Sequence, residues 1–419
     1  RTRGLFFIGA AVALVGVTMA MQMGLNANFL SEDIGINGRQ IGMLEAARES
    51  CGILALAVLA VLAGFAEPLV GAAMLLLVGT GLGAYVFVHS FTWVLLMSLV
   101  WSQGLHVWMP LPNSMAISLA EPGRTGHRLG QIQAAGAAGF AGGLVLALAL
   151  TMLGDVMRAL HMAALLVPAG GFATGEGILP GVIDTLGKIS MRTTYLLAGG
   201  AAVLAAAACV AIPRRIKTPG PRLVFRRRYG LYYVLCLLEG WRKQIFICFA
   251  GFLLVNVFHT PLWVMLLLMI GVQATGYVTS PAVGRLIDRI GERPVLIFYY
   301  SCLTLFFVGY AVVPNRGVLY GIYVIDNAFF VFAMSLTTYV SRIAPQKELT
   351  PTLSMGVAMN HVAAVAMPFV GGILWGKFGY RWTFFIGAAA ALLSVGVTLR
   401  VPRRAPVAVA AVADVAAEG

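Results

Sequence analysis

The chain has 419 residues, of which 60% are hydrophobic and only 11% are charged. Soluble domains carry charges on about 25% of their residues, so this composition excludes a soluble globular protein. A net charge of +13 would indicate nucleic-acid binding in a soluble chain. In this chain most basic residues lie in the loops on one side of the predicted membrane spans, so nucleic acid is not an expected partner.

Apolar stretches of about 20 residues, each long enough to cross a hydrocarbon core of about 30 Å, recur along the whole chain. Backbone groups in lipid must form their hydrogen bonds within the segment, so these stretches are helices. We predict an all-α polytopic membrane protein with about twelve transmembrane helices. The predicted spans are 4–30, 40–63, 67–89, 91–119, 129–153, 193–213, 230–258, 261–284, 294–313, 317–341, 352–376 and 382–401.

The first apolar stretch, which begins at Gly4, is too long for the core of a cleavable signal peptide and is expected to be the first span. Most Lys and Arg residues fall on the side of the two termini, which predicts that both termini are cytoplasmic, in a bacterial inner membrane. Five cysteines lie in apolar segments without metal-ligand spacing and are expected to be core or lipid-facing residues: Cys51, Cys209, Cys236, Cys248 and Cys302.

The second span carries the first group of charges, Glu45, Arg48 and Glu49. Their spacing places acid and base on one helical face. A charge at the bilayer centre costs at least ~2.5 kcal/mol, so it usually faces a cavity or a partner. The group is predicted to be either an ion pair that holds helices in register or a gate on the outer side.

The fourth span is interrupted by Pro110, Pro112 and Asn113 shortly after His106. A broken helix exposes backbone groups to ligand or water, which makes His106 a candidate substrate-binding residue. Segment 154–192, between the fifth and sixth spans, contains an apolar run too short to cross the bilayer. It is expected to form a helix lying on the outer membrane surface or a partial lid over the cavity.

The longest basic run, with several prolines and a glycine, lies at 214–229. It divides the spans into an N-terminal bundle (1–213) and a C-terminal bundle (230–401), followed by a disordered tail at 402–419. The run sets topology and contacts anionic lipid headgroups, and as a flexible connector it would let the two bundles move against each other.

The seventh span carries Glu239, Arg242 and Lys243 on one face. Two adjacent cations exceed what one glutamate neutralises. The surplus indicates either an anionic or zwitterionic substrate, bound by Arg242 and Lys243, or a pairing with Asp326 of the tenth span. Glu239 and Asp326 are candidate proton-coupling residues. His361 of the eleventh span is either a packing residue or a proton carrier.

The turn after the eighth span reads Gly284-Arg-Leu-Ile-Asp288-Arg289-Ile-Gly291-Glu-Arg293. This sequence resembles the G-x-x-x-D-R-x-G-x-[RK] loop signature of the major facilitator superfamily. Glycine permits a tight turn at position 291. The resemblance implies two pseudo-symmetric six-helix halves, with this loop as a latch that stabilises one conformation.

The eleventh span adds a second resemblance, from Pro368 through Gly371-Gly372 to Gly379-Tyr-Arg381. Small residues there allow close helix packing. The fifth span contains a similar pair, Gly142-Gly143. Aligning the two glycine pairs places Gln131 at the position equivalent to Asn360, as expected if the two halves are repeats. These two amides are predicted to hydrogen-bond the substrate.

The chain departs from the family pattern in two places. The loop at 64–68 lacks the usual first copy of the signature, and the fourth span lacks the arginine that proton-coupled members often place before Gly104. The family resemblance therefore does not by itself imply proton coupling.

The predicted function is secondary active transport, by symport or antiport, of a small organic solute through alternating access. The sequence has no phosphate-binding loop and no metal or nucleophile constellation, so we expect a monomer that is not an enzyme and uses no cofactor or metal. The alternative is a lipid-moving or non-transporting membrane assembly protein with the same architecture.

Overall fold

The computed structural model describes residues 2–62, 64–121, 125–166, 178–214, 216 and 225–403. Every long element in this part of the chain is a helix. The predicted tail at 402–419 lies almost wholly outside the described residues, and so does most of the basic linker.

The first half forms six long helical segments. They are α1 (Thr2–Asn28) with the π-helical turn η1 (Phe29–Asp33), α2 (Gly38–Val61), α3 (Glu67–Gly83) with η2 (Ala84–Phe87), α4 (Phe91–Trp108) with α5 (Leu111–Leu119), α6 (Thr125–Leu166), and α7 (Ile178–Val210).

The second half forms six more segments, preceded by the short turn η3 (Arg227–Tyr229). They are α8 (Gly230–Ile245) with the π-helical turn η4 (Phe246–Ala250) and α9 (Gly251–Asn256), α10 (Leu262–Ile290), α11 (Glu292–Val312), α12 (Arg316–Phe329) with η5 (Phe330–Ala333) and α13 (Met334–Ile343), α14 (Gln346–Phe378), and α15 (Tyr380–Thr398). The predicted count of about twelve is confirmed.

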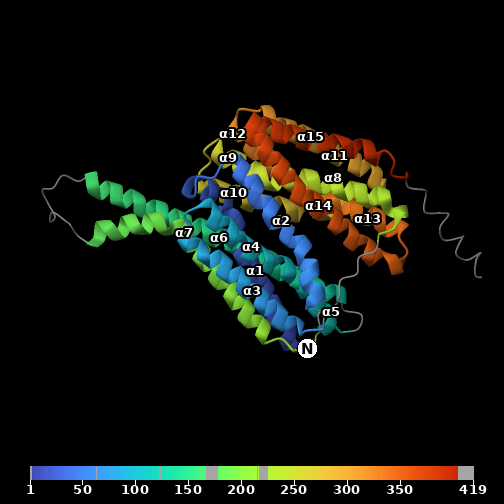
Figure 1. Ribbon diagram of the computed structural model, residues 1–419, viewed down its shortest axis with the longest axis horizontal. Helices are drawn as coiled ribbons and strands as arrows, with labels where there is room; N and C mark the ends of the chain where they lie inside the picture. Colours follow the sequence, from blue (N-terminus) through green and yellow to red (C-terminus); the bar gives the residue numbers. More distant parts are fainter. Residues whose placement is uncertain are drawn as a thin grey trace, which may run out of the picture.

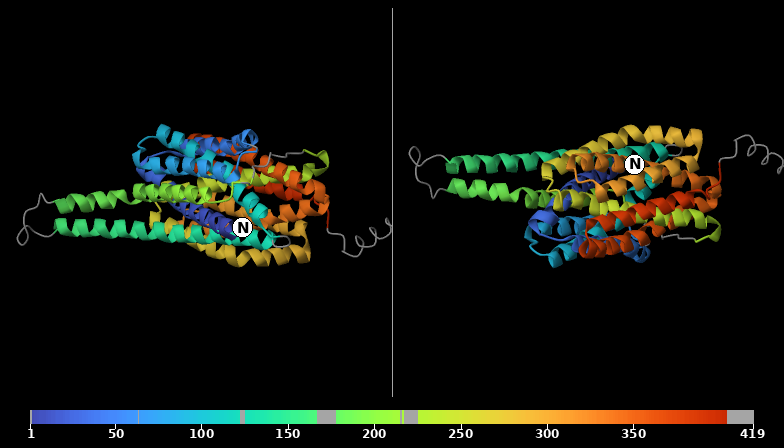
Figure 2. Two further views of the ribbon diagram at one scale, coloured as in Figure 1. Left: turned by 90° about the horizontal axis from the view of Figure 1, so that it is seen from below. Right: turned by 90° about the horizontal axis from the view of Figure 1, so that it is seen from above.

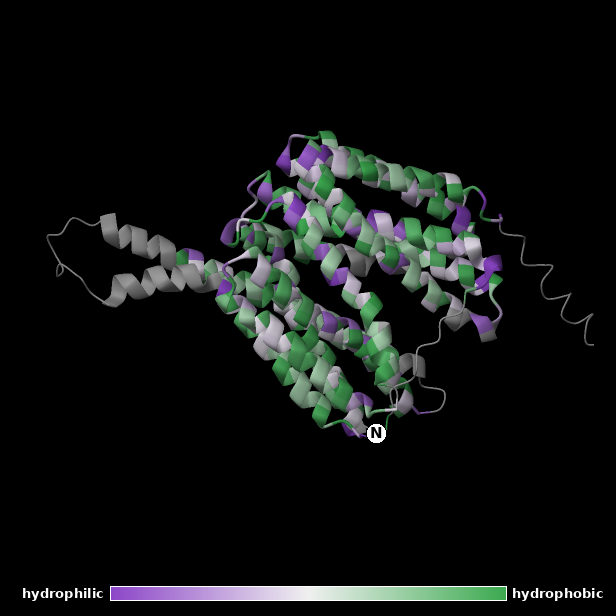
Figure 3. Cartoon of the chain, viewed as in Figure 1, coloured by the Kyte–Doolittle hydropathy of each residue, from purple (hydrophilic) through white to green (hydrophobic). Residues whose placement is uncertain are grey.

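The hydropathy of these helices makes the chain a multi-pass integral membrane protein. Within the described residues, nine helices are long and apolar enough to cross a membrane. Apolar residues cover most of the helix surfaces, and hydrophilic residues gather toward the helix ends (Figure 3). The charged groups of α2 and α8 and the buried Asp326 of α12 are exceptions inside the helical body.

The segments are arranged as two bundles. In the first half, α1 packs on α6 and α7, and α3 packs on α4 and α7; in the second, α8, α11, α14 and α15 pack together. The main contact between the halves joins α2 to α14. The halves lie close together where α2 begins and spread apart toward the end that carries the N-terminus (Figure 1).

Glycines set the close approach of α1 to α6. A Cβ at Gly139 would overlap the carbonyl oxygen of Ala13, and a Cβ at Gly143 would lie 2.8 Å from the Cα of Val17. Both positions oppose backbone atoms, which cannot move aside as a flexible side chain can. Gly139 and Gly143 of the fifth span therefore act in helix packing, as their small size predicts.

Substituting Gly139 with valine is expected to lower the free energy of unfolding by roughly 1–3 kcal/mol or more, since overpacking must push two helices apart. The matched control is Gly142→Val, because an added Cβ at Gly142 meets nothing within 4 Å. Thermal unfolding of the two purified variants checks this. Equal midpoints would show that α1 and α6 are not packed this closely.

The prediction for 154–192 was wrong. The backbone of α6 continues to Leu166 and that of α7 begins at Ile178, so no separate surface helix exists in the described part of this segment. Both views in Figure 2 agree with Figure 1 that the two helices run side by side and project beyond the other helices. Residues 167–177 lie outside the described part.

Other local predictions are confirmed. The fourth span breaks between Trp108 and Leu111. Gly291, with φ +83°, is the one residue between α10 and α11, and Gly379, with φ +86°, has the same place between α14 and α15. None of the five cysteines forms a disulfide; four are buried and Cys302 is half-buried.

The end of the basic linker is tied to the second half. Arg228 forms an ion pair with Glu348 in the first turn of α14, and the Tyr229 hydroxyl donates to the same carboxylate at 2.9 Å. These hydrogen bonds hold the pKa of Glu348 below its usual range. The contact fixes where the connector enters the C-terminal bundle.

Candidate functional site

The two halves meet tightly at one end of their interface, here called the closed end and defined by Gly38, Gly42, Pro368, Gly372 and Trp375. A Cβ at Gly42 would overlap the carbonyl oxygen of Pro368 and lie 2.7 Å from the Cα of Gly372. Gly38 packs directly against the Trp375 indole. Packing of this kind brings the backbones of α2 and α14 into direct contact at Gly42.

Two further contacts support the closed end. The Trp375 ring stacks on Phe249 of η4 with centroids 5.6 Å apart, and the Cys248 thiol donates to the Ile41 carbonyl at 3.8 Å. A capping box starts α2 at this end, where the Asn37 side chain accepts hydrogen bonds from the backbone N–H groups of residues 39 and 40. The start of α2 is therefore fixed against the C-terminal half.

A cavity of about 220 Å³ lies between the halves. Its walls come from α1, α2 and α6 on one side and from η4, α9, α10 and α12 on the other. The polar lining residues are Gln22, Asn26, Glu45, Arg48, Glu49, Gln273, Tyr323 and Asn327. The apolar lining includes Met19, Met23, Phe140, Phe246, Phe252, Met265 and Met269. The cavity thus has one charged wall, supplied by α2, and an otherwise amphipathic surface.

Arg48 is held in the charged wall by its neighbours. Its guanidinium lies 2.5 Å from the Glu45 carboxylate and 4.4 Å from the centre of the Trp101 ring. The Trp101 indole N–H donates to the Tyr85 hydroxyl at 3.3 Å. The predicted ion pair within the second span is present, and it borders the cavity.

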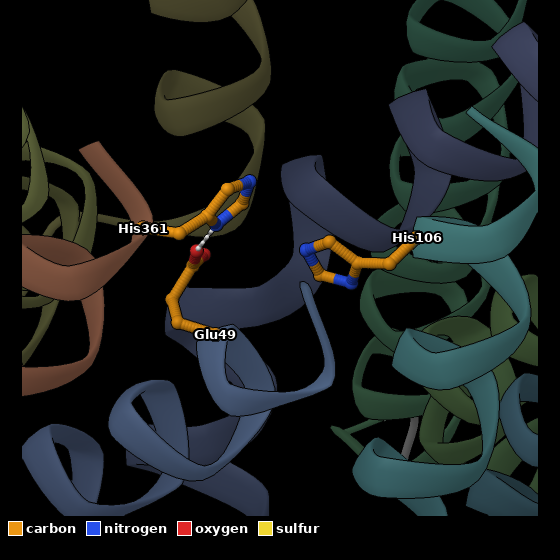
Figure 4. A group of neighbouring side chains, drawn as sticks. All are labelled: Glu49, His106 and His361. Atoms are coloured by element: carbon orange, nitrogen blue, oxygen red, sulfur yellow. Dashed lines mark ion pairs between the residues drawn. The ribbon is translucent and has the colours of Figure 1, made fainter. Parts of the chain in front are cut away.

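Glu49 reaches across the interface to the other half. Its carboxylate lies 3.4 Å from the His361 Nδ1 on α14. The His106 ring on α4 lies 5.7 Å from the His361 ring, centre to centre. Figure 4 shows the two imidazoles and the carboxylate converging from three helices. Sequence analysis assigned these residues to three different roles, and the structure places them together.

A second charged group is buried inside the C-terminal half. Arg242 is 0% exposed; it forms an ion pair with Glu239, lies 3.7 Å from Asp326, and donates to the Tyr299 hydroxyl at 2.9 Å. Its guanidinium also lies 4.6 Å from the centre of the Phe330 ring. Of the two interpretations of the surplus cation, the pairing with Asp326 is the one present in this conformation.

The comparisons with known proteins agree with this architecture. The family model of the Major Facilitator Superfamily matches residues 264–416. The multi-drug resistance efflux pump PmrA of Streptococcus pneumoniae is 28% identical over 123 residues, which are 29% of this chain and 30% of that protein. Multidrug resistance protein 2 of Bacillus subtilis is 25% identical over 161 residues, 36% of this chain and 40% of that protein. The matches thus span less than half the length of these curated relatives.

Solved structures match over almost the whole chain. The nucleoside transporter NupG has a TM-score of 0.72 at 13% identity, covering 94% of this chain and 98% of that one. An inward-facing bacterial homolog of the human lysosomal transporter Spinster gives 0.70 at 12% identity, covering 96% and 98%. A D-xylose-proton symporter gives 0.64 at 13% identity, also covering 96% and 98%.

The part of the chain from residue 264 to residue 416 is therefore similar to the major facilitator superfamily, and the fold of the whole chain is similar to that of the solved transporters. The 284–293 loop and the eleventh span, which carry the resemblance in the sequence, both lie within this matched part. The solved structures that match the fold of the chain are themselves transporters.

The remaining candidate residues lie away from the cavity lining. Asn360 faces α8, where its amide donates to the Cys236 carbonyl at 3.5 Å, although the adjacent His361 faces α2. Gln131 is exposed and accepts from Arg128 at 3.0 Å. Lys243 is half-buried, and the described residues provide no ion pair for it.

The loop with the family signature lies at the turn from α10 to α11. Arg289 is exposed, Arg293 is half-buried, and Gly284 lies within α10 with open space at its Cβ position. The side chain of Asp288 lies outside the described part. The latch role of these residues remains a prediction.

Sequence analysis missed the polar side chains that the first and eighth spans contribute to the cavity. Gln22 donates to Asn26 at 3.2 Å on one face of α1, and Gln273 lines the cavity from α10. A pair of amides four residues apart inside an apolar span is the signal that could have identified α1.

Proposed function

We propose that this protein is a secondary transporter that carries a small organic solute across the cytoplasmic membrane by alternating access. The observation that carries the proposal is a cavity walled by both six-helix halves and closed at one end by α2 and α14. Rocking the N-terminal bundle (1–213) against the C-terminal bundle (230–401) opens that end and exposes the same cavity to the other side. The basic linker, 214–229, connects the two.

The cavity favours a zwitterionic solute with an apolar part. Glu45, Arg48 and Glu49 present both signs of charge on one wall, and phenylalanine and methionine side chains cover much of the rest. Arg242, which with Lys243 led the sequence to indicate an anionic or zwitterionic substrate, is neutralised by two carboxylates and is not a lining residue. Two relatives are named for multidrug resistance, and these names support an organic solute that carries apolar groups.

Proton coupling and orientation complete the proposal. Glu239 and Asp326, held against Arg242, are the carboxylates that take up and release protons, with His361 as a third candidate. Both termini are cytoplasmic, which follows from the excess of basic residues on that side. The closed end then faces outward, and the spread end of Figure 1 faces the cytoplasm.

Transport by the purified chain in vesicles, with and without a pH gradient, tests the proposal across a panel of zwitterionic, anionic and cationic solutes. The double variant Gln273→Leu/Asn327→Leu removes two cavity amides and is expected to raise KM about tenfold, equivalent to ~1.4 kcal/mol of binding energy. The control is Gln133→Leu, an exposed amide on α6. An unchanged KM would overturn the cavity assignment, and movement of labelled lipid without solute transport would support the lipid-moving alternative.

A further inference from the structure

We propose that Glu49, His106 and His361 form a binding site for a divalent transition-metal ion of the Zn²⁺ type, held between the two halves of the protein. This inference goes beyond solute transport and does not depend on it. The three residues come from α2, α4 and α14, so no sequence motif joins them. Each offers one ligand atom, and these atoms all lie within 4.8 Å of one another.

The distances are close to those of a metal site. Four ligands at ~2.0–2.1 Å from a tetrahedral Zn²⁺ are about 3.3–3.4 Å apart. The Glu49 carboxylate oxygen and the His361 Nδ1 are 3.4 Å apart. The three ligand atoms all lie within 4.8 Å of one another, so binding an ion requires the remaining pairs to approach by at most about 1.4 Å to reach tetrahedral spacing.

The contacts of His106 and His361 leave one ring nitrogen of each residue available to bind a metal ion. The His106 Nδ1 lies 2.8 Å from the Ser102 carbonyl oxygen. As the donor in that contact it fixes the ring and leaves Nε2 with a free lone pair, which is how metal-binding histidines are usually oriented. The His361 Nδ1 is buried and points at the Glu49 carboxylate, 3.4 Å away (Figure 4). This separation is too long for a strong hydrogen bond, and a metal ion between the two atoms would bind both.

The backbone makes room for the two rings. A Cβ at Gly52 would lie 2.8 Å from the His361 ring and 3.0 Å from the His106 ring. Gly52 follows Glu49 by three residues and shares its face of α2. Any larger side chain at position 52 would displace the imidazoles.

Charge and ligand type select the ion. Arg48 is already paired with Glu45, which leaves the Glu49 charge available to a cation. Two imidazoles and one carboxylate suit Zn²⁺, Co²⁺ or Ni²⁺, whereas Mg²⁺ and Ca²⁺ prefer oxygen ligands alone. Because His361 belongs to the second half, a bound ion would stabilise the arrangement in which α2 and α14 are in contact.

Titration of the full-length protein, purified in detergent through a tag without histidine, with Co²⁺ and then Zn²⁺ tests the site. A single equivalent of Co²⁺ is expected to give the visible absorption of a low-symmetry N/O-coordinated ion, and Zn²⁺ is expected to displace it. His106→Gln, His361→Gln and Glu49→Gln should each weaken binding at least ~100-fold. His89→Gln and His259→Gln are matched controls, because both histidines are exposed and far from the site in sequence.

Gly52→Val keeps all three ligands but fills the space between the rings, and is expected to weaken binding to a similar extent. Unchanged affinity in the ligand variants would overturn the proposal. If those variants fail to fold, X-ray absorption spectroscopy of the Zn²⁺-loaded unmodified protein decides: two imidazole ligands support the site, and any other ligand set refutes it.

Discussion

Replacing Arg242 with alanine is expected to destabilise the protein by roughly 3–5 kcal/mol, because two buried carboxylates lose their counter-charge. Arg242 is 0% exposed and lies between Glu239 and Asp326. The variant also removes the donor to Tyr299 and the ring contact with Phe330. Thermal unfolding of the purified protein should show a large drop in midpoint.

Two companion variants show whether the loss comes from the charges. Lys243→Ala, one residue further along α8, should change the midpoint little, since Lys243 is half-buried and has no ion pair within the described residues. The triple variant Arg242→Met/Glu239→Gln/Asp326→Asn should recover much of the stability, because it leaves no unpaired charge in the interior. If Arg242→Ala and Lys243→Ala behave alike, the buried ion pairs described above do not exist.

Replacing Gly42 with valine should prevent the closed end from forming. The new side chain would occupy the space of the Pro368 carbonyl and the Gly372 backbone, so α2 and α14 must separate. Turnover is expected to fall about tenfold for each ~1.4 kcal/mol by which the closed-end state is disfavoured.

Cys248 reports this change directly, because it is buried beneath the Ile41 carbonyl at the closed end. A membrane-impermeant maleimide added to intact cells should alkylate Cys248 faster in Gly42→Val than in the unmodified protein, with the site of labelling identified by peptide mass. Met43→Val is the control, since Met43 is the exposed neighbour on the same helix. Equal labelling of the two variants would contradict the assigned packing.

Several features followed from the sequence alone. The apolar stretches predicted the twelve helical segments, and Gly291 and the Gly371-Gly372 pair predicted a tight turn and a close helix contact. Charges inside the second and seventh spans were identified as exceptional. These features depend on the transfer of a short segment from water to lipid and on local backbone geometry, and both are encoded within a few neighbouring residues.

Only the tertiary structure decided which charges meet and which face the cavity. Helical periodicity places Glu45 and Arg48 on one face of α2, but it does not say whether that face meets a cavity. Periodicity also could not decide whether Arg242 binds the substrate or pairs with Asp326. Glu49, His106 and His361 had been assigned separate roles, and no metal site was expected. Helices far apart in the chain bring these three side chains together, and interhelical packing, unlike hydropathy, is not a property of any single segment.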